Sequence, residues 1–323
     1  MSRLLTACLG AALCLGWLLP CAAAQYPERG VRLIVPYPAG QTTDVIGREI
    51  GQQMAQELGQ PFYVDNRAGA GGIIGMEAGK RAEADGYTLL VTASGPVGIN
   101  PGLYDSLPYD VERDYEPVGL IAMVPLFLVV RSDFPADDVQ GLIEHVRRHP
   151  GQLNYGSGGS GLTNHLTMEI FKSRTDLNMM HVPYRGATAA LTGLIGGDVA
   201  VMFEAGPAIM PHVQSGALKI LGVSTQEPSR AFPDAPPIGQ AGVPGFAAQA
   251  WIVMLAPART PAPVIERLNA TLAKVLAQPA VQRKLSALGA ETVSYTPAQT
   301  RAFIREEIGV WTRAVRLSNA KPG

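Results

Sequence analysis

Two segments of the chain share a layout that can bind an anion without a dedicated basic side chain. Each has a short apolar run, a loop of small residues and the start of a helical pattern, and they span Val35–Asp44 and Tyr155–Thr163. A helix start presents unpaired backbone N–H groups and the positive end of the helix dipole, and small residues let a ligand come close. Two such ends can hold the two ends of a small anion, although each loop alone also fits an ordinary βα turn.

Three charged side chains lie at the ends of these or neighbouring predicted elements. Asp44 falls in the first helical turn, where a carboxylate either complements the dipole or answers an ammonium or hydroxyl group of a ligand. Glu204 follows a predicted strand at 199–203, and Arg185 follows one at 179–182. Each of these two either meets a ligand at the strand end or is solvated, and the sequence leaves both interpretations open.

Other reactive residue types show no catalytic or metal-binding pattern. Three of the histidines are far apart and lack metal-ligand spacing, and the loop serines have no G-x-S-x-G context. These residues are His165, His181, His212, Ser94, Ser157 and Ser160. We therefore expect structural histidines, no catalytic residues and no bound metal, and a secreted hydrolase is the least supported alternative.

One glycine pattern resembles a dinucleotide-binding fingerprint. Gly156, Gly158 and Gly161 fit the G-x-G-x-x-G spacing, but no clear acidic residue stands about 20 positions further on, as such a site requires. No cofactor is therefore expected.

The composition of the 323-residue chain is that of a globular protein with a large core. Hydrophobic residues make up 47%, charged residues 16%, and the formal net charge is −1, so nucleic acid is not an expected partner. The first 24 residues differ: Arg3 is their only charge, an apolar run follows, and Ala22–Ala24 forms a small-residue cleavage site. This pattern predicts a secretory signal peptide over residues 1–24, the alternative being a retained anchor. All three cysteines lie within it.

Strand and helix patterns alternate along the rest of the chain, which predicts α/β sheets with mainly parallel strands. A strand at 32–35 leads into a helix with Thr42 or Thr43 as its cap, since apolar residues recur every four positions from Ile46. Thr296 and Gln299 predict a capping box for a last helix, with Pro297 at its first position. Pro125 interrupts an apolar stretch and predicts a crossing between two lobes.

The chain resembles the Bug family, the extracytoplasmic receptors of tripartite tricarboxylate transport systems. The matching stretches follow the family's order and cover nearly all of the chain after residue 24. They are VRLIVPYPAGQTTDVIGREI (31–50), VDNRAGAGGIIG (64–75), ADGYTLLV (84–91), LNYGSGGSGLTNHLTMEIF (153–171), HVPYRGATAAL (181–191) and VPGFAAQAWIVMLAPARTP (243–261).

The resemblance implies a periplasmic binding protein-like α/β fold of two lobes, each a mixed sheet flanked by helices, with the ligand cleft between them. It also implies that lobe 2 (125–246) is inserted into lobe 1 (25–124 plus 247–323). Family members hold small carboxylates largely through loop backbone groups and bridging water. The resulting ligand-binding set is Tyr37, Pro38, Ala39, Gly40, Gln41, Thr42, Asp44, Ser94, Ser157, Gly158, Gly161, Thr163, His165, Tyr184, Arg185, Gly186 and Glu204.

Two positions depart from the family pattern. The first loop usually reads glycine-glycine after its alanine, but here Gly40 is followed by Gln41, whose amide can narrow the pocket or bond the ligand. Arg185 stands where lysine is common, which keeps the charge and changes its geometry.

The expected function is a monomeric periplasmic receptor that captures a di- or tricarboxylate, an acidic amino acid or an aromatic acid for a membrane permease. The alternative is a sensor that presents its closed form to a membrane signalling protein.

Overall fold

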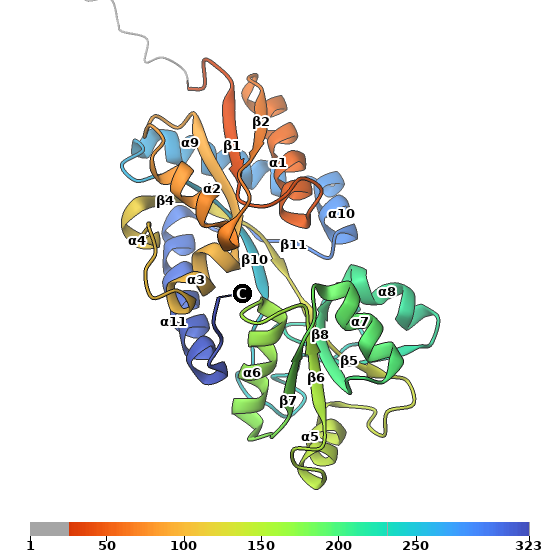
Figure 1. The fold of residues 1–323 in the computed structure, drawn as a ribbon. Coiled ribbons are helices and arrows are strands. Elements are labelled where there is room, and N and C mark those ends of the chain that lie inside the picture. The colour runs from red at the N-terminus through yellow and green to blue at the C-terminus, as the bar shows by residue number, and fades with distance from the viewer. Residues whose placement is uncertain (1–25, 231, 323) are drawn as a thin grey trace, which may run out of the picture.

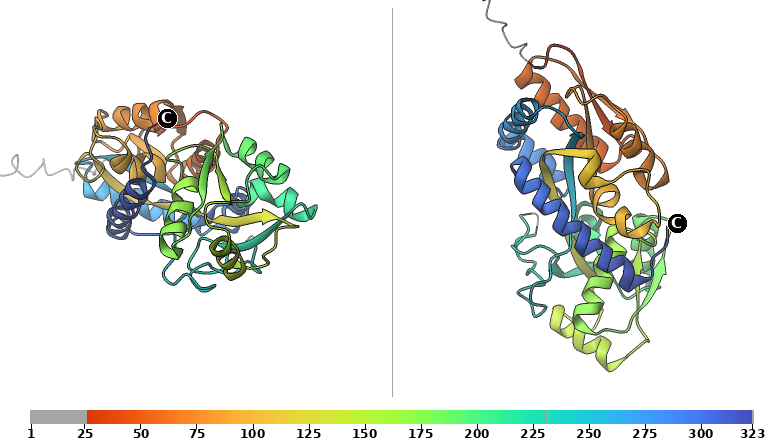
Figure 2. Two further views of the ribbon diagram at one scale, coloured as in Figure 1. Left: turned by 60° about the horizontal axis from the view of Figure 1, so that its bottom comes forward. Right: turned by 90° about the vertical axis from the view of Figure 1, so that its left-hand side faces the viewer.

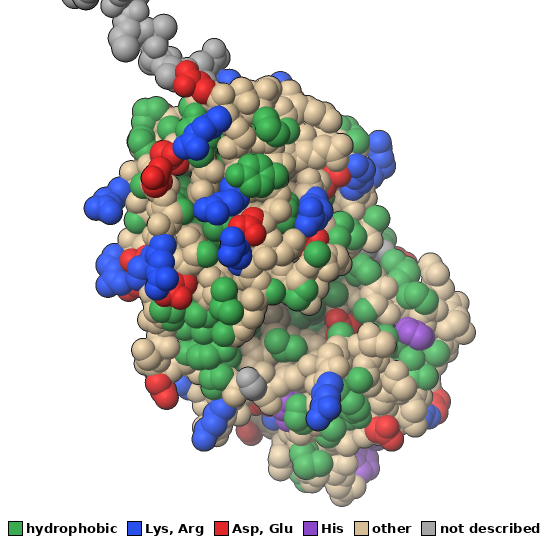
Figure 3. All heavy atoms as spheres, turned by 45° about the horizontal axis from the view of Figure 1, so that its top comes forward, with side chains coloured by type: hydrophobic (Ala, Val, Ile, Leu, Met, Phe, Trp, Pro, Cys, Tyr) green, Lys and Arg blue, Asp and Glu red, His purple; other side chains and the backbone are tan. Residues whose placement is uncertain are grey.

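Strands and helices of the chain build two sheets, one in each of two lobes (Figure 1). The computed structural model describes residues 26–230 and 232–322. The predicted signal peptide, its cleavage site and its cysteines lie outside the described residues. Figure 3 shows a hollow between the two lobes.

The sheet of the first lobe has six strands, in the order β11-β4-β10-β3-β1-β2. β1 pairs in parallel with β2 and β3, whereas β10 runs antiparallel to β3 and β4, and β11 runs antiparallel to β4. The strands are β1 (Val31–Val35), β2 (Phe62–Asn66), β3 (Thr88–Ala93), β4 (Tyr115–Val124), β10 (Ala250–Pro257) and β11 (Glu291–Thr292).

The sheet of the second lobe has five strands, in the order β7-β6-β8-β5-β9. β6 is parallel to β7 and β8, and β5 is antiparallel to β8 and β9. Both sheets are therefore mixed, and the expectation of mainly parallel strands is wrong. The strands are β5 (Leu126–Arg131), β6 (Asn154–Ser157), β7 (Met180–Pro183), β8 (Val201–Ala205) and β9 (Leu218–Val223).

Helices cover both faces of each sheet, so each lobe has a core on either side. In the first lobe α1, α9 and α10 pack on one face and α2 and α11 on the other. In the second lobe α5 and α6 cover one face and α7 and α8 the other. The helices are α1 (Thr42–Leu58), α2 (Ile73–Lys80), α3 (Asn100–Leu103), α4 (Val111–Asp114), α5 (Val139–Arg148), α6 (Thr163–Thr175), α7 (Ala187–Gly196), α8 (Gly206–Gln214), α9 (Ala262–Leu276), α10 (Pro279–Ala287) and α11 (Pro297–Ser318), with a 3₁₀ turn at Ala70–Gly72 and a π-helical turn, η2, at Gly95–Ile99.

The chain passes between the sheets beside Pro125, where β4 ends at Val124 and β5 begins at Leu126, and again between β9 and β10. The last helix touches both lobes, because α11 contacts β4 and α3 as well as α6 (Figure 2). Trp311 and Ala314 near its end join the core beneath α6. This half of α11 therefore packs against both lobes, because Trp311 also contacts Gly98 of η2, and the assignment of 247–323 to the first lobe stays a prediction.

The start of α11 has the predicted capping box, since Thr296 and Gln299 bond each other's backbone N–H groups. The predicted cap of α1 is wrong: the helix starts at Thr42 after Gln41, which makes no side-chain capping bond. Within residues 26–230 and 232–322, none of the helices combines the length and apolar character that a membrane span needs.

Candidate functional site

The first ligand loop, Pro36–Gln41, connects the end of β1 to α1. Its residues Pro38–Gln41, and Thr42 at the start of the helix, are exposed. Gly40 has a φ of +86°, and a Cβ added there would meet nothing within 4 Å. The loop therefore presents open backbone at the N-terminus of a long helix, as the anion-binding argument requires.

Asp44 fixes the shape of this loop from beneath. Its carboxylate accepts hydrogen bonds from the Gly40 N–H (2.8 Å), from Asn66 Nδ2 (2.8 Å) and from Arg48 Nε (3.1 Å). Asn66 Nδ2 also donates to the Tyr37 carbonyl (3.0 Å), and Arg48 Nη2 donates to Asn66 Oδ1 (2.9 Å). Asp44 is only 2% exposed, and its carboxylate positions the loop through these bonds.

The charge of Asp44 is maintained by these bonds. Burial opposes its ionisation, but the bonds from Arg48, the Gly40 N–H and Asn66 outweigh that cost and lower the pKa of the carboxyl. Asp44 therefore stays ionised, and keeps its bonds to the first loop, at neutral and mildly acidic pH.

Ser94 stands at the end of β3, beside the first loop. Because β1 and β3 are parallel neighbours, the residues after both strands meet at one edge of the sheet. A Cβ added at Gly95 would lie 3.4 Å from the Tyr37 hydroxyl, so the two chain segments are in close proximity. Ser94 itself is 2% exposed and Tyr37 is half-buried.

The second ligand loop, Ser157–Leu162, connects β6 to α6 and lies beside the β7–α7 connection. The Gly186 N–H donates to the Gly158 carbonyl (3.0 Å), and a Cβ at Gly158 would come within 3.0 Å of the Ala187 nitrogen. A Cβ at Gly161 would lie 3.1 Å from Leu103 of α3, so this loop also approaches the first lobe. Thr163, the first residue of α6, is partly exposed at the helix N-terminus.

Two side chains of the predicted ligand-binding set lie beneath the second ligand loop. The Ser157 hydroxyl is buried and bonds His181 Nε2 (2.6 Å), and His165 Nδ1 accepts the Gly161 N–H (3.0 Å). His165 is only 3% exposed, and its ring, like the Ser157 hydroxyl, supports the loop from beneath.

Glu204 at the end of β8 faces the N-terminus of α6. It accepts hydrogen bonds from Asn164 Nδ2 (3.3 Å) and from the Ala205 N–H (2.9 Å), and it is 7% exposed. Burial raises the pKa of Glu204, and the bonds from Ala205 and Asn164 only partly oppose this. The Glu204 carboxyl is therefore buried and hydrogen-bonded beside the start of α6, and the alternative that it is solvated is wrong.

The β7–α7 connection holds the remaining predicted contacts. A Cβ added at Gly193 would lie 2.3 Å from the Tyr184 hydroxyl, so that ring fills the layer between the sheet and α7 instead of covering the loop. Arg185 is exposed, and Gly186 has a φ of +102° with open space around its Cα. Arg185 is thus the cationic side chain of the predicted set.

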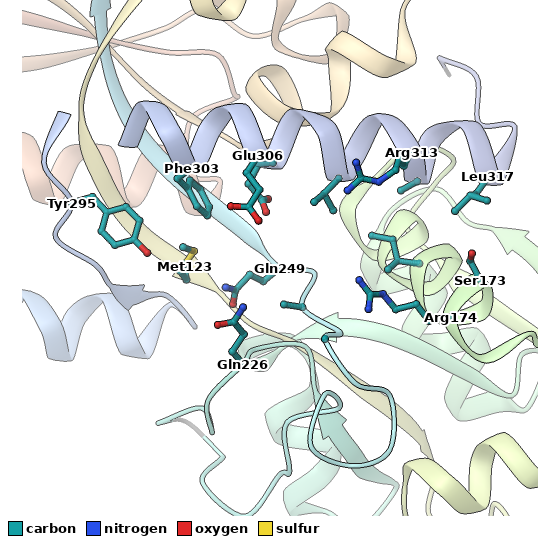
Figure 4. A pocket seen from close by; sticks show the side chains of 16 residues that line it. Met123, Ser173, Arg174, Gln226, Gln249, Tyr295, Phe303, Glu306, Arg313 and Leu317 are labelled. Carbon is teal, nitrogen blue, oxygen red and sulfur yellow. The ribbon is translucent and has the colours of Figure 1, made fainter. Parts of the chain in front are cut away.

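A separate cavity of about 600 Å³ lies beneath α11 (Figure 4). Arg313 and Glu306 of α11 face it, opposite Arg174 of α6 and Gln249 before β10. Its lining contains none of the predicted ligand-binding residues. Among the described residues, no group of three or more acidic, histidine or cysteine side chains is placed to hold a metal ion.

The two loops occupy equivalent places in the two lobes. The parallel strands β1 and β3 of one lobe and β6, β7 and β8 of the other lead, through loops or directly, into helices or helical turns. Ligands of open α/β sheets sit at such strand ends.

A model of the tripartite tricarboxylate transporter family receptor, TctC, matches residues 46–319. The chain belongs to this family. BugT of Bordetella pertussis (strain Tohama I) is 38% identical over 307 residues, which cover 95% of this chain and 94% of BugT. The family identity confirms the resemblance seen in the sequence.

Solved structures confirm the two-lobed fold of this TctC receptor. The R. palustris protein Rpa4515, solved with adipate, is 33% identical with a TM-score of 0.77, over 92% of this chain and 100% of that one. MatC from Rhodopseudomonas palustris, solved with bound malate, is 31% identical with a TM-score of 0.72, over 90% and 100%. This TctC receptor is thus an extracytoplasmic solute-binding protein of a transport family.

Sequence reasoning missed the residues that position the loops. Arg48 has a sequence signal, since it stands four residues after Asp44 on one helix face. Asn66 and Asn164 have none, because each meets its partner through strand pairing or packing between distant segments.

Proposed function

We propose that this receptor captures a small carboxylate between the first and second ligand loops and hands it to the membrane components of a tripartite tricarboxylate-type transporter. The observation that carries the proposal is the pair of loops, one per lobe, that present backbone at helix N-termini. Adipate in Rpa4515 and malate in MatC support a dicarboxylate as the ligand class.

In this proposal the carboxylate groups are bound mainly by backbone N–H donors and bridging water. Helix N-termini favour anions, and water-mediated bonds are nearly as favourable in enthalpy as direct ones. Gln41, Thr42 and Thr163 are placed to add side-chain contacts, and Arg185 to add a charge, because all four are at least partly exposed at the loops. Gln41 is the residue that we expect to set ligand preference.

Binding is proposed to close the cleft by rotation of one lobe on the other. Residues 25–124 with 247–323 form one lobe, 125–246 form the other, and the chain bends near Pro125 and Phe246. The mature chain starts after residue 24 and acts in the periplasm as a monomer that binds without turnover.

A thermal-shift panel tests the ligand class. The mature protein is heated with mono-, di- and tricarboxylates, amino acids and aromatic acids, and a ligand at 100 times its Kd should stabilise the fold by about 2.7 kcal/mol. We expect a carboxylate to give the largest shift and to be recovered unchanged after incubation. Stabilisation by another class alone would refute the carboxylate assignment, and conversion of the hit would favour an enzyme.

A further inference from the structure

Two histidines from separate elements stack beneath the second ligand loop. His165 of α6 and His181 of β7 have ring centroids 3.9 Å apart and planes 13° apart, and the Tyr155 ring lies 4.9 Å from His181 and 6.2 Å from His165, nearly parallel to both. The strand register brings Tyr155 and His181 together, because Tyr155 of β6 pairs directly with His181 of β7.

Each ring bonds a different point of the loop. His181 Nε2 lies 2.6 Å from the Ser157 hydroxyl, which also accepts the Gly159 N–H at 3.2 Å. His165 Nδ1 accepts the Gly161 N–H at 3.0 Å. The pair therefore fixes the start and the end of the segment from Ser157 to Gly161, which contains two glycines with positive φ, Gly159 at +147° and Gly161 at +77°.

We propose that His165 and His181 are positioning residues for the second ligand loop: stacked as a neutral pair, they hold its backbone in the conformation that receives the ligand. This inference rests on the proposed function, in which that loop binds the carboxylate. A protonated His165 carries a hydrogen on Nδ1, which then faces the Gly161 N–H and cannot accept it. Protonation of both rings also places two cations face to face.

The charged neighbours of the pair come from α6 and from the C-terminal segment. Glu169 of α6 accepts hydrogen bonds from the Tyr155 hydroxyl and from Lys172 Nζ (2.7 Å). Lys321 of the C-terminal segment lines a second cavity together with both histidines, Glu169 and Lys172. The pKa of each histidine is lowered to about 4, chiefly by burial; His181 also lowers that of His165, Lys172 lowers both, and Glu169 opposes the shift. His165 and His181 are therefore both uncharged at neutral pH.

Paired substitutions separate ring chemistry from packing. His165→Leu and His181→Phe remove the bonds to the loop, whereas His165→Asn and His181→Gln return a polar atom near Nδ1 and Nε2 respectively. His212→Gln on α8 is the control, because its ring is outside the pair. Each variant is measured at pH 7.5 for amide protection of Gly159 and Gly161 without ligand, and for its Kd with malate and adipate.

The Leu and Phe variants should lose about tenfold in loop protection and in affinity, as expected for one lost hydrogen bond, and the Asn and Gln variants should recover most of it. Unchanged loop protection in the Leu and Phe variants overturns the inference. A wild-type protein that binds neither acid refutes the proposed function instead, and loop protection still decides the positioning role.

A titration of the wild-type protein covers the case in which the Leu or Phe variants fail to fold. Imidazole and loop-amide NMR signals are followed from pH 7.5 to 3.5. We expect the Gly159 and Gly161 amides to shift with the same midpoint as the two rings, near pH 4. Loop amides that ignore the ring titration would contradict the inference.

Discussion

The two ligand loops have the same strand–loop–helix layout but are braced by opposite chemistry. The first loop is held by an ionised carboxylate, Asp44, with Arg48 and Asn66 around it. The second is held by the neutral rings of His165 and His181. A helix N-terminus can thus be shaped for an anion either by a buried charge or by uncharged acceptors, and the two solutions respond differently to acid.

The largest effect is expected from removing the Asp44 carboxylate beneath the first loop. Asp44→Ala leaves the Gly40 N–H, Asn66 and Arg48 without their acceptor, so the free energy of unfolding should fall by roughly 2–3 kcal/mol and ligand affinity by more than tenfold. Urea unfolding and calorimetric titration measure the two quantities.

The matched control for Asp44 is Asp138→Ala. Asp138 is exposed and caps α5 through the Gly141 N–H (2.7 Å), far along the chain from either loop. The Asp138→Ala substitution should lower the free energy of unfolding by about 1 kcal/mol and leave ligand affinity unchanged. Equal losses of affinity in both variants would mean that Asp44 acts only through global stability.

The pH dependence of stability should separate the two loops next. The pKa values of His165 and His181 fall from 6.5 to about 4 on folding, so below pH 6.5 the unfolded chain takes up protons first. The free energy of unfolding is fully retained above pH 6.5 and should fall by roughly 2 kcal/mol between pH 6.5 and 4.

The Asp44 contribution has its own window. Its pKa is lowered below 3.8, so this stabilisation is present above that value and is lost only at more acid pH. Unfolding in urea at a series of pH values checks both windows. The double variant His165→Asn/His181→Gln should flatten the step between pH 6.5 and 4, and an unaltered step would show that other groups cause it.

A smaller effect is expected at Gly40. Gly40→Ala forces a side chain into a φ of +86° at a cost of about 1 kcal/mol, and its methyl group enters the space where the ligand is proposed to lie. Gly216→Ala meets the same strain, with a φ of +76° and open surroundings, away from both loops. Both variants should lose similar stability, but only Gly40→Ala should lose affinity, by about tenfold; the same affinity in both would argue against ligand contact at Gly40.

The smallest effect is expected from Gln41→Gly. Gln41 makes no side-chain capping bond, so stability should change by only a few tenths of a kcal/mol. The ratio of affinities for short and long dicarboxylates should nevertheless shift a few-fold, because the amide borders the proposed ligand space. An unchanged ratio would remove Gln41 from the specificity determinants.

Local patterns predicted the segments that build the site. The strand Val31–Val35, the helix that follows the first loop and the capping box at Thr296 all depend on residues within a few positions of one another. The helices Val139–Arg148 and Gly206–Gln214 were not predicted, although Asp138 caps the first of them.

The braces of the loops could not be predicted, because they depend on contacts between distant segments. Asp44 meets Asn66 only after β1 and β2 pair, and His165 meets His181 only after β6 and β7 align. The sequence placed Asp44 and His165 in the segments of the two loops, but their side chains lie beneath those loops. Side-chain direction at a turn follows from the register of its neighbours, which no local pattern records.

A crystal structure of the mature protein with the best carboxylate from the thermal-shift panel tests the central claim most directly. The account predicts density for the ligand between the lobes, with carboxylate oxygens within hydrogen-bond distance of backbone N–H groups, directly or through one water, in both Pro38–Thr42 and Ser157–Thr163. A carboxylate bound instead in the cavity beneath α11, or touching the loop of one lobe only, would contradict it.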